Sequence, residues 1–143
     1  MTFFATDAQS IRRALLLDAT ASGAMGMLLI VGAGPLETLL GLPGGLLRAV
    51  GLFLIPFAAF LIWLARRADV LRGLVRTIVI GNVLWVLASL LLLLSGWVSP
   101  TGVGMAFVVG QAVAVAVFAY LEHRAVARSA TLTTAAGSAV GGR

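Results

Sequence analysis

Four long runs of apolar and small residues dominate the hydropathy pattern, and short polar or Gly- and Pro-containing segments separate them. The runs cover about residues 14–34, 46–65, 74–96 and 101–121. Each is close to the ~20 residues that an α-helix needs to cross the hydrocarbon of a bilayer. The run over 87–96, LASLLLLLSG, lacks the alternation typical of barrel strands. Because a backbone in lipid must satisfy its hydrogen bonds internally, each run predicts a transmembrane helix.

Composition supports this interpretation. Only 10% of the 143 residues are charged, 61% are hydrophobic, and the mean hydropathy is +1.11. A soluble domain carries charge on about a quarter of its residues, so lipid must be the main solvent of this chain. We therefore predict an all-α membrane protein with a four-helix transmembrane bundle over 14–124. A cytoplasmic segment over 1–13 precedes it, and a tail over 125–143, which lacks an apolar periodicity, is predicted to be disordered.

Two absent residue types narrow the possible chemistry. The chain has no cysteine, which excludes disulfides, thiolate catalysis and cysteine-ligated metals. It also has no lysine, which excludes Schiff-base cofactors and P-loop phosphate binding. The single histidine, His123, cannot supply a closed zinc site or both axial ligands of a haem. We therefore expect no metal, no cofactor and no enzymatic activity.

Arginine placement predicts the orientation in the membrane. If the N-terminus lies inside, the outer segments carry only Arg48. The inner segments then carry the other nine arginines: Arg12, Arg13, Arg66, Arg67, Arg72, Arg76, Arg124, Arg128 and Arg143. This asymmetry is a strong positive-inside signal, so both termini are expected in the cytoplasm. It also accounts for the pI of about 11.6 without any binding of nucleic acid.

A shift of the chain by 64 positions aligns similar residues with each other. It places Arg12 on Arg76, Asp18 on Asn82, and Gly32 on Gly96. The match indicates two helical hairpins of like orientation. In a chain so rich in leucine and alanine, chance similarity is the alternative explanation.

Asp18 interrupts the first apolar run, about one helical turn inside its cytoplasmic end. An acid at the centre of a span costs ~2.5–3.5 kcal/mol and less near an end, so such residues usually face the bundle. Its own helix offers no partner, and we expect one from Asn82 at similar depth in the third run or from an arginine such as Arg76. Asp18 is therefore either a packing residue or a protonatable site.

Gln111 lies near the middle of the fourth run, at a depth similar to that of Pro56 in the second. A proline frees the carbonyl one turn earlier, here over residues 52–53. We expect Gln111 to donate to that carbonyl, and a role in substrate binding is the alternative. Asp18, Asn82 and Gln111 are thus the candidate polar cluster of the bundle.

Small residues recur along one face of the fourth run, at Gly102, Ala106, Gly110 and Ala114. Such faces let another backbone approach closely. The first run offers a matching surface around Gly23 and Gly26. We expect these two surfaces to pack together inside the chain. The alternative is a docking face for a partner protein or a second copy.

Four segments carry a likeness to known proteins: GPLETLLGLP, LIPFAAFLIWLARR, GNVLWVLASLLLLLSGW and PTGVGMAFVVGQAVAVAVFAYLE. They resemble a group of small four-helix bacterial integral membrane proteins with no established activity. The resemblance covers about residues 12–124. It implies the same architecture and a place in the bacterial inner membrane, and it leaves the function open.

Two functions are consistent with these patterns. The first is a non-enzymatic structural or accessory membrane component that acts through helix packing, in contact with lipid and with a larger complex or a second copy. The second is a small proton-linked transporter that uses Asp18, with Gln111 near the path of the solute.

Overall fold

The computed structural model describes residues 2–67 and 72–140, with side chains described over 9–67 and 73–128. Over these residues the chain forms five helices: α1 (Thr2–Val31), α2 (Ala33–Leu40), α3 (Gly44–Arg66), α4 (Arg72–Leu94) and α5 (Gly102–Val140). Four stretches are long and apolar enough to cross a membrane: Gln9–Val31, Gly44–Arg66, Gly73–Leu94 and Gly102–Arg128. The predicted fold class is confirmed, and the chain is an integral membrane protein that contacts lipid.

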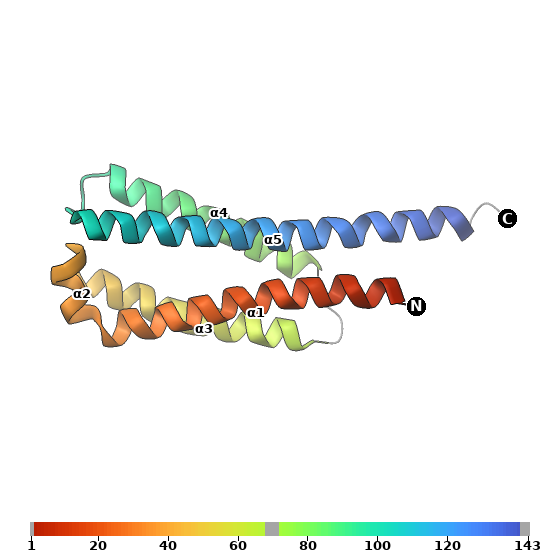
Figure 1. Cartoon of the computed structure of the whole chain (residues 1–143), viewed down its shortest axis with the longest axis horizontal. Helices are drawn as coiled ribbons and strands as arrows, with labels where there is room; N and C mark the ends of the chain where they lie inside the picture. The colour runs from red at the N-terminus through yellow and green to blue at the C-terminus, as the bar shows by residue number, and fades with distance from the viewer. Residues whose placement is uncertain (1, 68–71, 141–143) are drawn as a thin grey trace.

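The four long helices form two pairs (Figure 1). α1 packs along α3, α4 packs along α5, and α1 and α5 form the contact between the pairs. α2 lies at the end opposite to the two termini, against α1, α3 and α5. α1 and α4 begin at the same end of the bundle, so the two pairs have the like orientation that the 64-residue shift indicates.

Helix α2 connects the first pair and anchors it to the second. Gly41 caps its C-terminus, with a φ of 66° in the left-handed region that a residue without Cβ adopts readily. The Gly41 N–H donates to the carbonyl of Glu37 at 2.9 Å. Thr101 donates its backbone N–H to the Leu40 carbonyl at 2.9 Å and its hydroxyl to the Leu39 carbonyl at 2.7 Å. These bonds fix the end of α2 on the start of α5.

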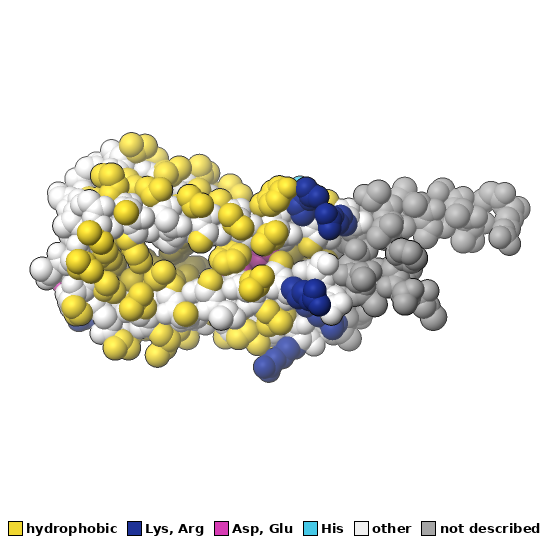
Figure 2. All heavy atoms as spheres, viewed as in Figure 1, with side chains coloured by type: hydrophobic (Ala, Val, Ile, Leu, Met, Phe, Trp, Pro, Cys, Tyr) yellow, Lys and Arg dark blue, Asp and Glu magenta, His cyan; other side chains and the backbone are white. Residues whose placement is uncertain are grey.

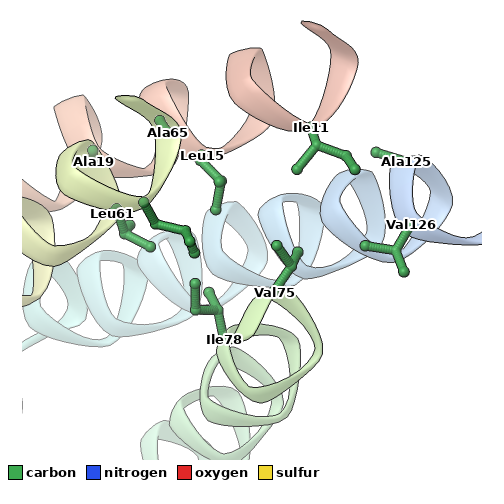
Figure 3. Close-up of a cluster of buried hydrophobic side chains, with 10 residues drawn as sticks. Ile11, Leu15, Ala19, Leu61, Ala65, Val75, Ile78, Ala125 and Val126 are labelled. Atoms are coloured by element: carbon green, nitrogen blue, oxygen red, sulfur yellow. The ribbon is translucent and has the colours of Figure 1, made fainter. Parts of the chain in front are cut away.

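Two apolar clusters hold the helices together. One lies toward the end with the termini and takes side chains from all four long helices (Figure 3): Ile11, Leu15, Ala19, Leu61, Leu64, Ala65, Val75, Ile78, Ala125 and Val126. The other lies toward α2: Leu29, Ala33, Leu40, Leu42, Leu47, Leu54, Val98 and Val108. Between the two clusters, residues of all four long helices line a cavity.

Many large hydrophobic side chains are exposed, and on the face shown in Figure 2 they spread along the bundle, as expected for lipid contact. On α4, Leu84, Leu91 and Leu94 are more than half exposed, whereas Asn82 is buried. Most of the described arginines gather near the end with the termini (Figure 2). Arg48 is the exception, because it lies near the start of α3, at the end of the bundle that carries α2.

The bounds of two helices differ from the sequence prediction. α1 begins at Thr2, so the segment expected to precede the first span is helical from that residue on. α5 continues to Val140, so the tail that was predicted to be disordered over 125–143 is helical up to Val140. Its many alanines favour a helix, and no proline follows Pro100 to end it. Residues 141–143 lie outside the described residues.

Candidate functional site

Two carboxyl groups and one amide meet between α1, α4 and α5. The Nδ2 group of Asn82 donates to Asp18 Oδ2 and to Glu122 Oε2, each at 3.2 Å. Ser22, one turn after Asp18 on α1, donates its hydroxyl to Asp18 Oδ1 at 2.9 Å. We call Asp18, Asn82 and Glu122 the carboxyl cluster. The predicted pairing of Asp18 with Asn82 is confirmed, whereas the expectation that its own helix offers no partner is wrong.

The carboxyl cluster lies within the candidate spans, in the half of the bundle nearer the termini. Asp18 and Asn82 each stand nine residues after the start of their spans, at Gln9 and Gly73. Along their helices, Asp18 follows Arg13 by five residues and Glu122 precedes Arg128 by six, which at ~1.5 Å per residue is roughly 8–9 Å from the arginines at the end with the termini. Asp18 is 1% exposed and Glu122 is fully buried. Among the described residues no hydrogen bond joins either carboxyl to an arginine.

Glu122 also carries an oxygen without a partner. Its Oε1 is buried and makes no hydrogen bond to any described residue. Buried acceptors are normally satisfied, and an exception calls for a specific explanation such as a water, an ion or a proton. A proton on one of the two acids would let Glu122 bond to the carboxyl of Asp18, so the carboxyl cluster can hold a proton.

Gln111 belongs to a second group of hydrogen bonds. Its Oε1 accepts from Trp85 Nε1 and its Nε2 donates to Ser89 Oγ, both at 2.8 Å. The Ser89 hydroxyl donates to the Trp85 carbonyl at 2.8 Å. The predicted bond from Gln111 to the carbonyl freed by Pro56 is wrong, because α5 packs along α4 rather than α3.

A cavity of about 180 Å³ joins the two groups. Its polar walls are Asp18, Ser22, Asn82 and Gln111, and its aromatic walls are Phe53, Phe57, Trp85 and Phe118. The rings of Phe53 and Trp85 stack with centroids 6.0 Å apart, across the seam between α3 and α4. Figure 2 shows the hollow seam between the helix pairs, with an acidic side chain at its edge. An engineered apolar cavity of ~150 Å³ binds benzene, so the space suits a molecule of about one ring.

Sequence reasoning did not include Glu122 in the polar cluster. It lies in YLEHR beside Arg124, which has the appearance of an interfacial segment. A usable signal was its spacing from Gln111. Val115, Phe118 and Glu122 follow Gln111 by four, seven and eleven residues and therefore share its helix face. The first two line the cavity with Gln111.

The row of small residues on α5 does not pack on α1. Gly102, Ala106, Gly110 and Ala114 are exposed, and a Cβ built on either glycine meets no atom within 4 Å. The prediction of an internal contact along this row is wrong, because α5 is rotated so that Gly104, Val108 and Ala112 face inward. A docking role for the exposed row stays a prediction.

The small residues of α1 meet a different helix from the one expected. A Cβ on Gly26 would lie 3.1 Å from the Gly51 carbonyl oxygen, and one on Gly23 would lie 3.5 Å from Ala58 Cβ. Both neighbours belong to α3. The close approach therefore holds the first helix pair together rather than joining α1 to α5.

Comparison with known proteins identifies no family. No known protein family matches the sequence, and no curated protein or solved structure is significantly similar to it. What stands is a small all-helical protein with four candidate membrane spans.

Proposed function

We propose that this chain is a small proton-linked membrane transporter in which the carboxyl cluster binds the coupling proton. The observation that carries the proposal is Glu122, a second carboxyl that is fully buried and shares the amide of Asn82 with Asp18. Intramembrane acids that face the bundle interior are typical of proton and substrate pathways. The proposed activity is non-enzymatic.

Magnitudes favour function over packing. A hydrogen bond between transmembrane helices stabilises by about 0.6 kcal/mol on average and about 1.7 kcal/mol at most. A charged acid costs ~2.5–3.5 kcal/mol at the centre of a span and less near an end. Both acids are also buried between the helices, and one bridging amide offsets only part of the cost of burying two carboxyls. A bundle selected only for tight packing would place apolar side chains here.

The geometry also suits exchange between a proton and a small cation. Asp18 and Glu122 lie within two hydrogen-bond lengths of each other through Asn82 Nδ2, and two ionised carboxylates so close repel each other. A proton shared by the pair relieves that repulsion, and so does a cation in the cavity beside Asp18. The rings of Phe53, Phe57 and Trp85 line the same cavity, and aromatic rings attract cations.

Reconstituted vesicles provide the test. We expect phenyltrimethylammonium, a one-ring cation that cannot cross as a neutral base, to drive proton release from vesicles that contain the protein and a trapped pH-sensitive dye. Asp18→Asn and Glu122→Gln should each lower this flux at least about tenfold, because each removes one of the two carboxyls.

Glu37→Gln is the matched control, since Glu37 is an exposed acid on α2 outside the carboxyl cluster. It should transport like the wild type. Wild-type flux no faster than that of protein-free vesicles, or Asp18→Asn flux equal to the wild type, would contradict the proposal.

A structural or accessory role is the second candidate. The observation that favours it is that Asn82 joins α1, α4 and α5 through two hydrogen bonds, which fixes the register of the two helix pairs. On this hypothesis Asp18→Asn folds and assembles normally, with a modest loss of stability and no flux to lose.

We also propose a bacterial inner membrane with both termini in the cytoplasm. The support is the gathering of described arginines at the end with the termini, with Arg48 toward the other end. Alkaline phosphatase fused at residue 143 or within 66–72 should be inactive, whereas a fusion within 96–101 should be active. An active enzyme at residue 143 would reverse this topology.

A further inference from the structure

A second cavity lies between α1 and α5, near the end with the termini. It has a volume of about 440 Å³ and is separate from the carboxyl cluster. Arg13, Arg124 and Arg128 line it, and no acidic side chain does so among the described residues. We call it the arginine groove. Three guanidinium groups without a lining carboxylate make it a site for an anion, since arginine matches phosphate with paired N–H donors.

The arginine groove changes from basic to apolar along the bundle axis. Arg13 is four residues from Leu17 on α1, and Arg128 is seven residues from Leu121 on α5. At ~1.5 Å per residue these steps correspond to about 6 and 10 Å toward the membrane centre. Leu17 is 57% exposed and Leu121 is 39% exposed. The ligand that fits is therefore itself amphipathic, with an anionic end and an apolar chain.

Arg124 is positioned by its neighbour. Its Nη1 donates to Tyr120 Oη at 2.8 Å, and its guanidinium lies 5.6 Å from the centre of the Tyr120 ring. Arginine has five N–H donors, so this single bond orients the group and leaves others for a ligand. Tyr120 also lines the arginine groove and is 56% exposed.

The depth of the arginine groove matches that of lipid headgroups. Arg128 is the last residue of the fourth candidate span, and Arg13 lies in the first turns of the first span, which begins at Gln9. Basic pockets between transmembrane helices at this level bind anionic lipid headgroups. We propose that the arginine groove binds one anionic phospholipid, with its phosphate among Arg13, Arg124 and Arg128 and an acyl chain along Leu17 and Leu121.

The test compares lipids on the full chain in a neutral detergent, by native mass spectrometry and by titration of thermal stability. We expect phosphatidylglycerol to bind as a single retained molecule and to raise the melting temperature, whereas phosphatidylcholine does neither. Arg13→Gln, Arg124→Gln and Arg128→Gln combined should weaken phosphatidylglycerol binding at least tenfold, because each arginine near an anionic lipid contributes severalfold in affinity.

A matched variant carries Arg48→Gln, Arg66→Gln and Arg76→Gln, which removes the same charge from positions outside the arginine groove. It should bind within about twofold of the wild type. If both variants lose the same amount of phosphatidylglycerol affinity, the lipid is attracted by the overall positive charge and not by the arginine groove, which overturns the proposal. Equal stabilisation by inorganic phosphate would make it a soluble-anion site, and equal binding of phosphatidylcholine would exclude anion recognition, so either result overturns the proposal. The carboxyl cluster has no part in any of these outcomes.

Discussion

Asn82→Leu should destabilise the folded chain by about 3–5 kcal/mol, the cost typical of removing one partner from a buried charged network. The leucine leaves Asp18 and Glu122 facing each other without the donor that both share. Within the carboxyl cluster, Asn82 is the residue that donates a hydrogen bond to both carboxyls, so its replacement removes both bonds. The change is measured by unfolding in mixed micelles, followed by circular dichroism.

A triple variant separates the two candidate functions. Asp18→Leu, Asn82→Leu and Glu122→Leu combined replace the whole carboxyl cluster by apolar side chains. Such replacements of buried charged networks are often neutral or stabilising, so we expect the triple variant to recover most of the stability lost in Asn82→Leu, while proton flux is absent. A triple variant that is less stable than Asn82→Leu would show that the cluster is a packing device, and would favour the structural candidate.

Gly104→Leu should destabilise the chain by about 3 kcal/mol or more, because overpacking against a rigid backbone leaves no room to relax. A Cβ at this position runs into the backbone carbonyl of Leu40 at the end of α2. That carbonyl already accepts from the Thr101 N–H, so it is held in place. Unfolding of the purified protein in detergent measures the loss.

Gly110→Leu is the matched control on the same helix. A Cβ there meets no atom within 4 Å, so the stability of the monomer should change by less than about 0.5 kcal/mol. The comparison also tests the exposed row of small residues. If Gly110→Leu is as destabilising as Gly104→Leu, that face is covered in the protein, and a change in oligomeric state measured by light scattering would identify a second copy as the cover.

The pairing of Asp18 with Asn82 was predictable because two features of the sequence agreed. The 64-residue shift aligns the two residues, and both lie in the cytoplasmic half of their apolar runs. Depth along a helix follows from a fixed rise per residue, so a sequence gives it directly. Polar side chains at equal depth in an apolar bundle then have few other partners.

Rotation about the helix axis was less predictable. The recurrence of Gly102, Ala106 and Gly110 defines a face of α5. Whether that face points toward a neighbouring helix or toward lipid depends on which helices pair. Because α5 pairs with α4, Gln111 meets Trp85 and Ser89 rather than the carbonyl freed by Pro56.

The sequence by itself therefore determined the class of the protein and its four spans. Hydrophobicity and helix length decide these quantities residue by residue, without reference to any distant segment. The tertiary structure alone decided that Glu122 joins Asp18, that the small row of α5 faces outward, and that three arginines enclose one groove. Each of these depends on helix pairing and rotation, which result from the packing of all helices at once.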